Sequence, residues 1–322
     1  MLRRTLTPAP CHLLIGHIYI ITGPKFDDAR DIEAVRDRLS KEGIVFVNNC
    51  GEQELVELTQ SLGVPIRPRN EEKKGSCVSH IRNTPGLVGK GYTSEGKPAK
   101  TQKTCITRRT YHHYDTERKI DKLINTLLRE TYSLVLTTLG THTELFFHTD
   151  RSGWAKPPAI LATALKTPAT GGGGASLFVD GREVAQYIRV HEPALYDMMV
   201  STSPSHTSFK SDDGSFAARP IIVRLQQDQD EDQSHESSES DEEGGMRDMI
   251  IRFRLDGGIR FSPAMLSMLP RLEDLICERA FGVELSAGQG YIVDNHRFLH
   301  GRTAFEGDRE ILRVLAHSHD QA

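Results

Sequence analysis

Residues 145–150 are Leu145-Phe-Phe-His148-Thr-Asp150, and this stretch is the starting point for both the fold and the site. The adjacent Phe146 and Phe147 predict a buried β-strand. Because side chains alternate along a strand, His148 and Asp150 are expected to face the same way. An imidazole nitrogen and a carboxylate oxygen on one face can hold adjacent positions of a metal ion. A His-x-Asp pattern alone occurs by chance in many proteins and by itself favours a structural core histidine.

A second stretch far downstream favours a metal site over a structural core histidine. Residues 290–302 are Gly290-Tyr-Ile-Val-Asp-Asn-His-Arg-Phe-Leu-His300-Gly-Arg302, which predicts another buried strand running into a turn and a histidine. Two histidines and one carboxylate on one face of an octahedron, with three positions open, are the ligand set of non-haem Fe(II) oxygenases. The same ligand types also suit Zn²⁺ and Mn²⁺, so they leave the metal undecided.

Short β-rich runs separated by turns dominate the chain after residue 131. They cover residues 132–139, 143–148, 160–165, 175–180, 220–225, 249–255, 290–294 and 311–316. Helical stretches interrupt them near 183–190 and 264–280, and Ser262-Pro263 is a favourable opening for the second of these helices. Many short strands separated by turns favour a barrel or a jelly roll.

The residues before this β-rich part predict helices and one strand. A helix is predicted over 26–39 and stopped by Gly43, followed by a buried strand over 44–47. A second amphipathic helix carries Leu55, Leu58 and Leu62 and ends at Gly63; a third carries Ile120, Leu123, Leu127 and Leu128. Because no linker divides the chain, residues 1–322 are predicted to form one domain, with helices packed on a β-core.

Two segments have no periodic pattern. Residues 67–110 form a long basic loop rich in Gly, Lys, Thr and Pro, which is either disordered or a lid that closes over bound substrate. Residues 226–245 carry nine acidic residues and no Lys or Arg. Such a composition buries too little apolar surface to offset the entropy of ordering, so we expect a disordered insertion there. A docking site for a basic partner is the alternative.

The composition excludes a wholly disordered or a collagen-like chain. The chain has 322 residues, of which 37% are hydrophobic and 26% charged, as in ordinary globular proteins. Removing the nine acidic charges of the insertion from the net charge of −4 leaves +5 on the rest. A mildly basic body weakly supports anionic small ligands and gives no argument for nucleic acid.

The same sequence gives no indication of a membrane protein. No run approaches the ~18 apolar residues that cross a bilayer. The apolar run at 12–22 is short, holds two histidines and lacks a small-residue cleavage site, so no signal peptide is expected. Five cysteines, an odd number without CxxC spacing, argue against a disulfide framework and favour a reducing, cytoplasmic location.

Arg309 and Arg313 follow the second histidine in the sequence and could bind a carboxylate near the metal. An oxygenase that uses 2-oxoglutarate needs a cation for the far carboxylate of this co-substrate, and the planar fork of arginine suits it best. If residues 306–308 form a turn before a strand, then Arg309, Ile311 and Arg313 share one face. That face would lie beside the strand that carries His300.

Together these motifs resemble the taurine dioxygenase and clavaminate synthase-like family of Fe(II)- and 2-oxoglutarate-dependent oxygenases, including its γ-butyrobetaine hydroxylase branch. The resemblance extends over roughly residues 31–316. It rests on four segments: His148-Thr-Asp150, Pro157-Pro158, Thr170-Gly-Gly-Gly-Gly-Ala-Ser176-Leu-Phe-Val-Asp180-Gly and Asp294-Asn-His-Arg-Phe-Leu-His300-Gly-Arg-Thr-Ala-Phe. It implies an α+β fold with a distorted double-stranded β-helix (jelly-roll) core and flanking helices.

The resemblance also implies site residues. His148, Asp150 and His300 would ligate Fe(II); Arg313 would bind the C5 carboxylate of 2-oxoglutarate, with the Ser176 hydroxyl beside it. Arg309 competes with Arg313 for this role, and the run of four glycines allows the alignment at Ser176 to slip by one residue. The acidic insertion matches no pattern of the family.

The implied reaction consumes O₂ and 2-oxoglutarate, releases succinate and CO₂, and hydroxylates an unactivated C–H bond of a small molecule. This substrate would be an amino-acid-like or other anionic metabolite. Iron halogenases of the superfamily have a small residue in place of the carboxylate ligand. Asp150 therefore points to hydroxylation, or to related desaturation or ring closure.

Contacts with the substrate are predicted for four further residues. Arg302 follows His300 and could hold an anionic group, although a structural ion pair explains it equally well. Arg151 and Trp154 follow the carboxylate ligand, and Trp154 either lines the pocket or is a core aromatic residue. Arg82 lies in a region that often faces the substrate in this family. His112, His113 and His142 are not expected to be ligands.

Two alternatives belong to other functional classes. A Zn²⁺-dependent hydrolase or isomerase could use the same three ligands, without 2-oxoglutarate and without a role for Arg313. A protein or chromatin hydroxylase or demethylase could recruit a basic partner through the acidic loop, but that reading expects a lysine in place of Arg313. The sequence gives no prediction of oligomeric state.

Overall fold

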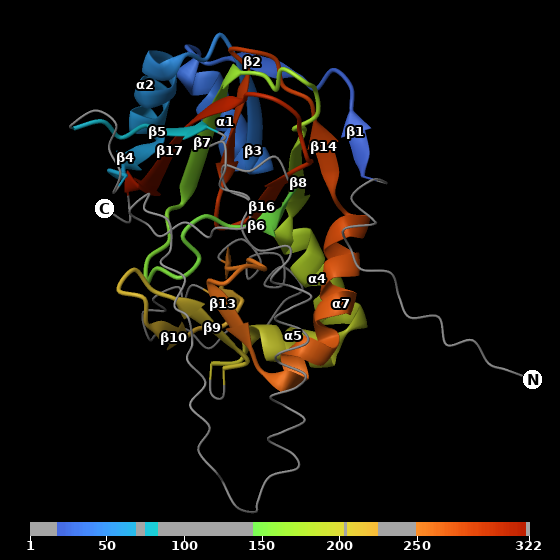
Figure 1. Cartoon of the computed structure of the whole chain (residues 1–322). Helices are drawn as coiled ribbons and strands as arrows, with labels where there is room; N and C mark the ends of the chain where they lie inside the picture. Colours follow the sequence, from blue (N-terminus) through green and yellow to red (C-terminus); the bar gives the residue numbers. More distant parts are fainter. Residues whose placement is uncertain (1–17, 69–74, 83–143, 203–204, 225–248, 320–322) are drawn as a thin grey trace, which may run out of the picture.

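The computed structural model describes residues 18–68, 75–82, 144–202, 205–224 and 249–319. Within them the chain has a mixed fold in which sheets predominate and a few helices flank them (Figure 1). The predicted helix near 120–128, the strand at 132–139, most of the loop at 67–110 and the acidic insertion at 226–245 lie outside the described residues, as do His112, His113 and His142.

The larger of two main sheets has seven strands. Its order is β2-β3-β15-β7-β17-β4, and β5 also pairs with β17. The strands are β2 (Phe26–Asp28), β3 (Ile44–Asn48), β4 (Gly63–Pro65), β5 (Ser79–Arg82), β7 (Ile160–Thr167), β15 (Gly290–Asp294) and β17 (Glu310–Ser318). The pairs β15–β3, β15–β7 and β17–β7 are antiparallel, so segments far apart in the sequence form its centre.

The second sheet has five strands in the order β1-β14-β8-β16-β6. They are β1 (Tyr19–Ile21), β6 (Leu145–His148), β8 (Ser176–Asp180), β14 (Phe281–Val283) and β16 (Phe298–Arg302). From β6 to β8, and again from β14 to β17, consecutive strands alternate between the two sheets. This alternation brings the two predicted halves of the site, on β6 and β16, side by side.

The two main sheets pack face to face through one apolar cluster. It joins Phe178 and Phe298 of the five-strand sheet to Leu161, Tyr291 and other residues of the seven-strand sheet. The ring centroids of Phe178 and Tyr291 are 4.7 Å apart in an edge-to-face arrangement. Because side chains alternate along each strand, the intervening residues point outward and form separate clusters under the helices.

Helices cover both outer faces (Figure 1). Helices α1 (Ile32–Glu42) and α2 (Glu52–Leu62) pack on the seven-strand sheet, and α2 is the second predicted helix, with Gly63 at its end as expected. Helices α4 (Gly181–His191), α5 (Pro193–Val200) and α7 (Pro263–Glu278) pack beside the five-strand sheet. The predicted start at residue 26 was wrong. Phe26–Asp28 pairs with β3, and the Asp31 side chain caps α1 at the backbone N–H of Ala34.

Two small sheets complete the described fold. One contains β10 (Phe216–Ala218), β9 (Thr207–Lys210) and β13 (Ile259–Phe261); the other pairs β11 (Ile222–Arg224) with β12 (Met249–Ile251). Cys50 and Cys77 are free thiols, whereas Cys277 is disulfide-bonded, which the cysteine count did not lead us to expect. Among the described helices, none combines the length and the apolar character that a membrane span requires.

Candidate metal centre

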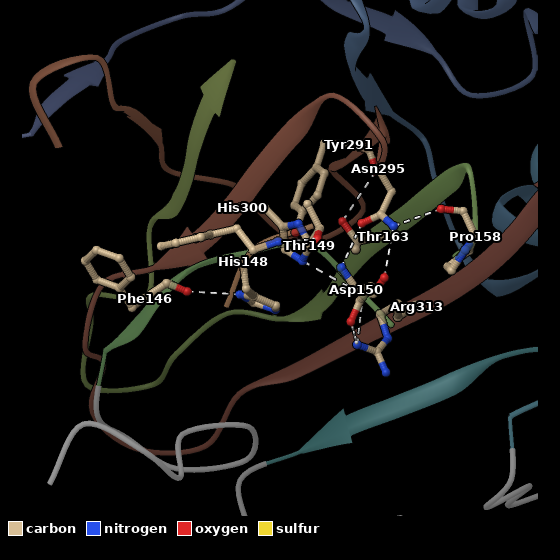
Figure 2. Close-up of polar contacts among 11 residues, drawn as sticks. Phe146, His148, Thr149, Asp150, Pro158, Thr163, Tyr291, Asn295, His300 and Arg313 are labelled. Carbon is tan, nitrogen blue, oxygen red and sulfur yellow. Dashed lines mark hydrogen bonds and ion pairs between the residues drawn. The ribbon is translucent and has the colours of Figure 1, made fainter. Parts of the chain in front are cut away.

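Three predicted ligands converge between the two main sheets. His148 ends β6, Asp150 lies in the turn that follows, and His300 lies in the middle of β16, directly opposite His148 in the strand register. One ligand atom from each lies within 4.8 Å of the other two. The ring centroids of the two histidines are 4.3 Å apart, and His300 Nε2 is 3.8 Å from Asp150 Oδ2 (Figure 2).

Local structure differs from the prediction at two of these positions. Asp150 is not on the strand with His148, because β6 ends at His148 and the chain turns there. His300 is inside a strand and not in a turn after one. The two histidines are therefore fixed by sheet pairing, whereas the carboxylate depends on the conformation of a turn.

One hydrogen bond orients the imidazole of His148. Its Nδ1 lies 3.0 Å from the backbone carbonyl of Phe146, a contact in which the ring N–H donates. Nε2 is then the atom with a lone pair available for a metal, the usual arrangement for histidine ligands. His300 Nδ1 is buried and has no hydrogen-bond partner among the described residues.

Burial and neighbouring charges together keep these ligands in the protonation states that bind metals. It lowers the pKa of His148, and it lowers the pKa of His300 to about 3 with the help of the adjacent His148. Burial alone would raise the pKa of Asp150, but Arg313 and the two histidines hold it well below its ordinary range. Two neutral imidazoles beside one carboxylate can hold a divalent cation without first losing protons.

The chemistry of this donor set fits Fe(II). Two imidazole nitrogens and one carboxylate oxygen are the ligands typical of non-haem iron oxygenases, and Mn²⁺ and Zn²⁺ accept the same atoms. The buried carboxylate already has a cationic partner, because Arg313 Nη1 lies 3.1 Å from each of its oxygens. Asp150 is thus ionised and held in place in the described structure.

A pocket opens at the three ligands. Its wall includes Ser176 of β8, Arg302 of β16, and Arg309 and Arg313 at β17. Arg309, Ile311 and Arg313 all line it, which confirms the predicted shared face. However, β17 belongs to the seven-strand sheet and faces β16 across the pocket instead of pairing with it. The pocket wall therefore carries three arginines beside one ionised aspartate.

Two of these arginines are deeply buried. Burial, together with the neighbouring Arg309, lowers the pKa of Arg302 to about 9, and burial also lowers the pKa of Arg309. The Arg302 guanidinium lies over the Phe305 ring at 4.4 Å, and Arg309 donates a 3.2 Å hydrogen bond to the carbonyl of Gly174. Buried cations such as these favour the binding of anionic ligands.

The other three predicted substrate residues lie elsewhere. Arg151 has a positive φ of 55° and lies over the Trp154 ring at 5.1 Å, and neither residue is among those lining the pocket. Arg82 donates a 2.8 Å hydrogen bond to Glu310 from a side chain that is 48% exposed. Its neighbour Ile81, on the opposite face of β5, lines the pocket instead.

Sequence reasoning missed several residues that build the site. Tyr291 and Thr163 line the pocket from β15 and β7, and period-two alternation within these strands could have identified them. Asn295 and Arg252 are buried behind Asp150 and hydrogen-bond to its turn. Nothing in a single sequence indicates that these two would contact residues roughly 100 to 145 positions away.

Comparison with known proteins gives one match that spans nearly the whole chain. The model of a family described as "Taurine catabolism dioxygenase TauD, TfdA family" matches residues 3–315. Gamma-butyrobetaine dioxygenase of Homo sapiens is 28% identical over 175 residues, which are 53% of this chain and 43% of that protein. Trimethyllysine dioxygenase of Neurospora crassa is 31% identical over 144 residues, 43% of this chain and 28% of that protein. The chain thus aligns with less than half of the length of these relatives.

Solved structures show the same fold at low sequence identity. An asparagine oxygenase, solved with Fe(II), 3-hydroxyasparagine and succinate, has a TM-score of 0.56 at 14% identity, covering 90% of this chain and 79% of that one. A putative alpha-ketoglutarate-dependent taurine dioxygenase from Burkholderia xenovorans has a TM-score of 0.54 at 13% identity, covering 95% of both chains.

Proposed function

Because the chain belongs to the TauD, TfdA family of dioxygenases, we propose that it is an Fe(II)- and 2-oxoglutarate-dependent dioxygenase that hydroxylates a small molecule. The observation that carries this proposal is the convergence of His148, Asp150 and His300 beside a pocket lined by three arginines. Two neutral imidazoles and an ionised carboxylate are ready to bind the metal. The arginines supply the positive charge that a dianionic co-substrate needs.

In this proposal His148, Asp150 and His300 would hold Fe(II). When bound, the metal supplies the oxygen chemistry that couples decarboxylation of 2-oxoglutarate to C–H hydroxylation. The protein binds and orients both organic molecules. Its buried walls, Tyr291 and Thr163 among them, exclude water from the reacting groups.

Arg313 and Ser176 are proposed to bind the far carboxylate of 2-oxoglutarate. Both line the pocket, on facing sheets, and Arg313 lies close to the metal ligands. Arg309 is the alternative, because its hydrogen bond to Gly174 places it next to the glycine run that leads to Ser176. Both arginines line the pocket, so the effect of replacing each one on the KM for 2-oxoglutarate decides between them.

The substrate is proposed to be an amino-acid-like or other anionic small molecule. Two sequence relatives are named as dioxygenases of γ-butyrobetaine and trimethyllysine, and one similar structure is that of an asparagine oxygenase. These names support this class of substrate. Within the pocket, Arg302 shares a strand face with His300 and is the residue proposed to hold an anionic group of the substrate. Arg82, Arg151 and Trp154 are not included in this proposed contact.

We also propose a finer fold assignment for the β-core. Strands that alternate between two facing sheets, with helices on the outer faces, support a distorted double-stranded β-helix within a single domain over residues 1–322. A lid at 67–110, an acidic insertion at 226–245 and a cytoplasmic location remain predictions from the sequence. Desaturation or ring closure by the same centre is the related alternative reaction, and a Zn²⁺-dependent hydrolase is the alternative of another class.

Two measurements test the proposal. Anaerobic addition of Fe(II) and 2-oxoglutarate to the wild type should give a visible charge-transfer band, and His148→Ala should abolish it. Release of succinate should then be measured across a panel of amino acids, betaines, sulfonates and related acids. A colourless wild-type complex together with no succinate release would contradict the dioxygenase assignment, and hydrolysis that needs Zn²⁺ but not 2-oxoglutarate would favour the alternative.

A further inference from the structure

The side chain of Asn295 holds both backbone groups of Asp150. Its Oδ1 accepts a 2.8 Å hydrogen bond from the Asp150 N–H, and its Nδ2 donates to the Asp150 carbonyl at 3.1 Å (Figure 2). The same Nδ2 donates at 2.8 Å to the carbonyl of Pro158, at the far end of the turn. Asn295 is 1% exposed, so these bonds form out of contact with water.

Asn295 connects the two halves of the ligand set. It follows β15 directly and precedes β16, the strand that carries His300. Its own backbone N–H donates to the carbonyl of Ala159, which fixes it against the segment that leads into β7. One buried amide, 145 residues from Asp150 in sequence, thus links the turn that carries the carboxylate ligand to the chain that leads to the second histidine.

The carboxylate is the ligand that needs such support. His148 and His300 are fixed by pairing of β6 with β16, whereas Asp150 lies in a turn and is followed by Arg151 at φ 55°, a conformation that costs free energy. Arg313 holds the carboxylate group, but it does not hold the Asp150 backbone. Without Asn295, the turn has one buried N–H and two buried carbonyls left to satisfy elsewhere.

Other buried side chains hold the rest of the turn without contacting Asp150. Arg252 donates to the carbonyls of Ser152, Trp154 and Ala155, and His296 Nε2 lies 3.1 Å from the carbonyl of Pro157. His296 is the immediate neighbour of Asn295, is similarly buried, and holds the residue before Pro158. Replacing His296 is therefore a matched control: it removes a contact to the same turn, but at a point distant from Asp150.

We infer that Asn295 is a positioning residue that sets the affinity and geometry of the metal site by fixing the Asp150 backbone. The inference rests on the proposed function, since it concerns the same centre. Residues that orient metal ligands typically contribute 10–100-fold in metal affinity. Asn295→Asp keeps an acceptor for the Asp150 N–H but faces the two carbonyls with a carboxylate, and Asn295→Ser is too short to reach any of the three groups.

The test is titration of the metal-free protein with Co(II) alone, followed by its visible absorption, alongside thermal unfolding of the metal-free forms. Asn295→Asp and Asn295→Ser should bind Co(II) about 10–100-fold more weakly than the wild type and alter its d–d bands. His296→Leu should lower the melting temperature but leave Co(II) affinity within about threefold, because it touches no ligand.

The possible results overturn either the inference on Asn295 alone or the proposed function as well. Folded Asn295 variants that bind Co(II) as tightly as the wild type, or a His296→Leu variant that loses as much affinity as they do, would overturn the inference alone. A wild type that binds no Co(II) would overturn the proposed function and this inference with it. If neither Asn295 variant folds, amide exchange in the wild type decides: the Asp150 N–H should be strongly protected, and exchange at the rate of an unstructured chain would refute the contact.

Discussion

Arg313 Nη1 lies 3.1 Å from each carboxylate oxygen of Asp150, so a candidate co-substrate arginine is also the ion-pair partner of a candidate metal ligand. The pair is largely buried, and removing one partner of such a pair is costly because the other charge is left uncompensated. Substitution of Arg313 should therefore affect both the co-substrate and the state of Asp150. Arg309, which lines the same pocket without this contact, separates the two effects.

We expect Arg313→Ala to raise the 2-oxoglutarate concentration needed for half-maximal succinate release by about tenfold or more. The physical reason is the loss of charge-assisted hydrogen bonds worth about 1.5–3 kcal/mol. The measurement is the KM for 2-oxoglutarate at saturating substrate. Arg309→Ala is the matched control, and a larger effect there than at Arg313 would move the carboxylate-binding role to Arg309.

The sequence predicted which three residues converge better than it predicted their local structure. His148, Asp150 and His300 were identified because the motifs around them resemble those of a known oxygenase family, and Gly290–Asp294 was predicted with the observed bounds. The strand was predicted to end at His148, as β6 does, but the period-two argument extended the strand geometry to Asp150 and so missed the turn there. What stops the strand is tertiary: Thr149 exchanges hydrogen bonds with the backbone of Phe253, a residue 104 positions later.

Candidate substrate residues were harder to predict for a related reason. Adjacent positions of a strand face opposite ways, so a shift of one residue decides whether a side chain enters the pocket. Ile81 lines the pocket, and Arg82 instead pairs with Glu310. Pairing of β5 with β17, which sets this register, connects residues more than 200 positions apart and leaves no local signal.

We expect the metal-free protein to lose stability as the pH falls below about 6.5. The ordinary pKa of histidine is 6.5, and burial lowers that of His300 to about 3, so between these values the unfolded chain binds a proton that the folded protein does not. The stabilisation is present above pH 6.5 and is lost progressively as the pH falls towards 3. Thermal unfolding with chelator present, from pH 7.5 to 5, measures it.

His300→Gln provides the comparison for this pH dependence. The variant lacks that proton uptake on unfolding, so its melting temperature should fall less steeply than that of the wild type over the same range. Parallel curves for the two proteins would show that His300 does not have the lowered pKa that its burial imposes.

Arg302 and Arg82 should differ sharply as substrate contacts. Arg302→Gln removes a buried cation from the pocket wall and should raise the KM for an anionic substrate about tenfold or more. Arg82→Gln breaks a half-exposed ion pair with Glu310, a kind of contact worth about 0–1 kcal/mol, and should change that KM less than about threefold. Steady-state kinetics on the substrate found in the succinate screen tests both, and equal effects would contradict the placement of Arg82.

Gly301 should matter for the geometry of the metal centre because it lies between His300 and Arg302 on β16. A Cβ there would come within 2.7 Å of the Leu145 carbonyl on β6, the strand that carries His148, at a point where the pairing register shifts. Gly301→Ala should push the two strands apart, costing about 1–3 kcal/mol of unfolding free energy and weakening Co(II) binding. Denaturant unfolding and Co(II) titration measure the two effects. Gly257→Ala, where a Cβ meets no atom within 4 Å, is the control; if it destabilises the protein as much as Gly301→Ala, the crowding between β16 and β6 is not the cause.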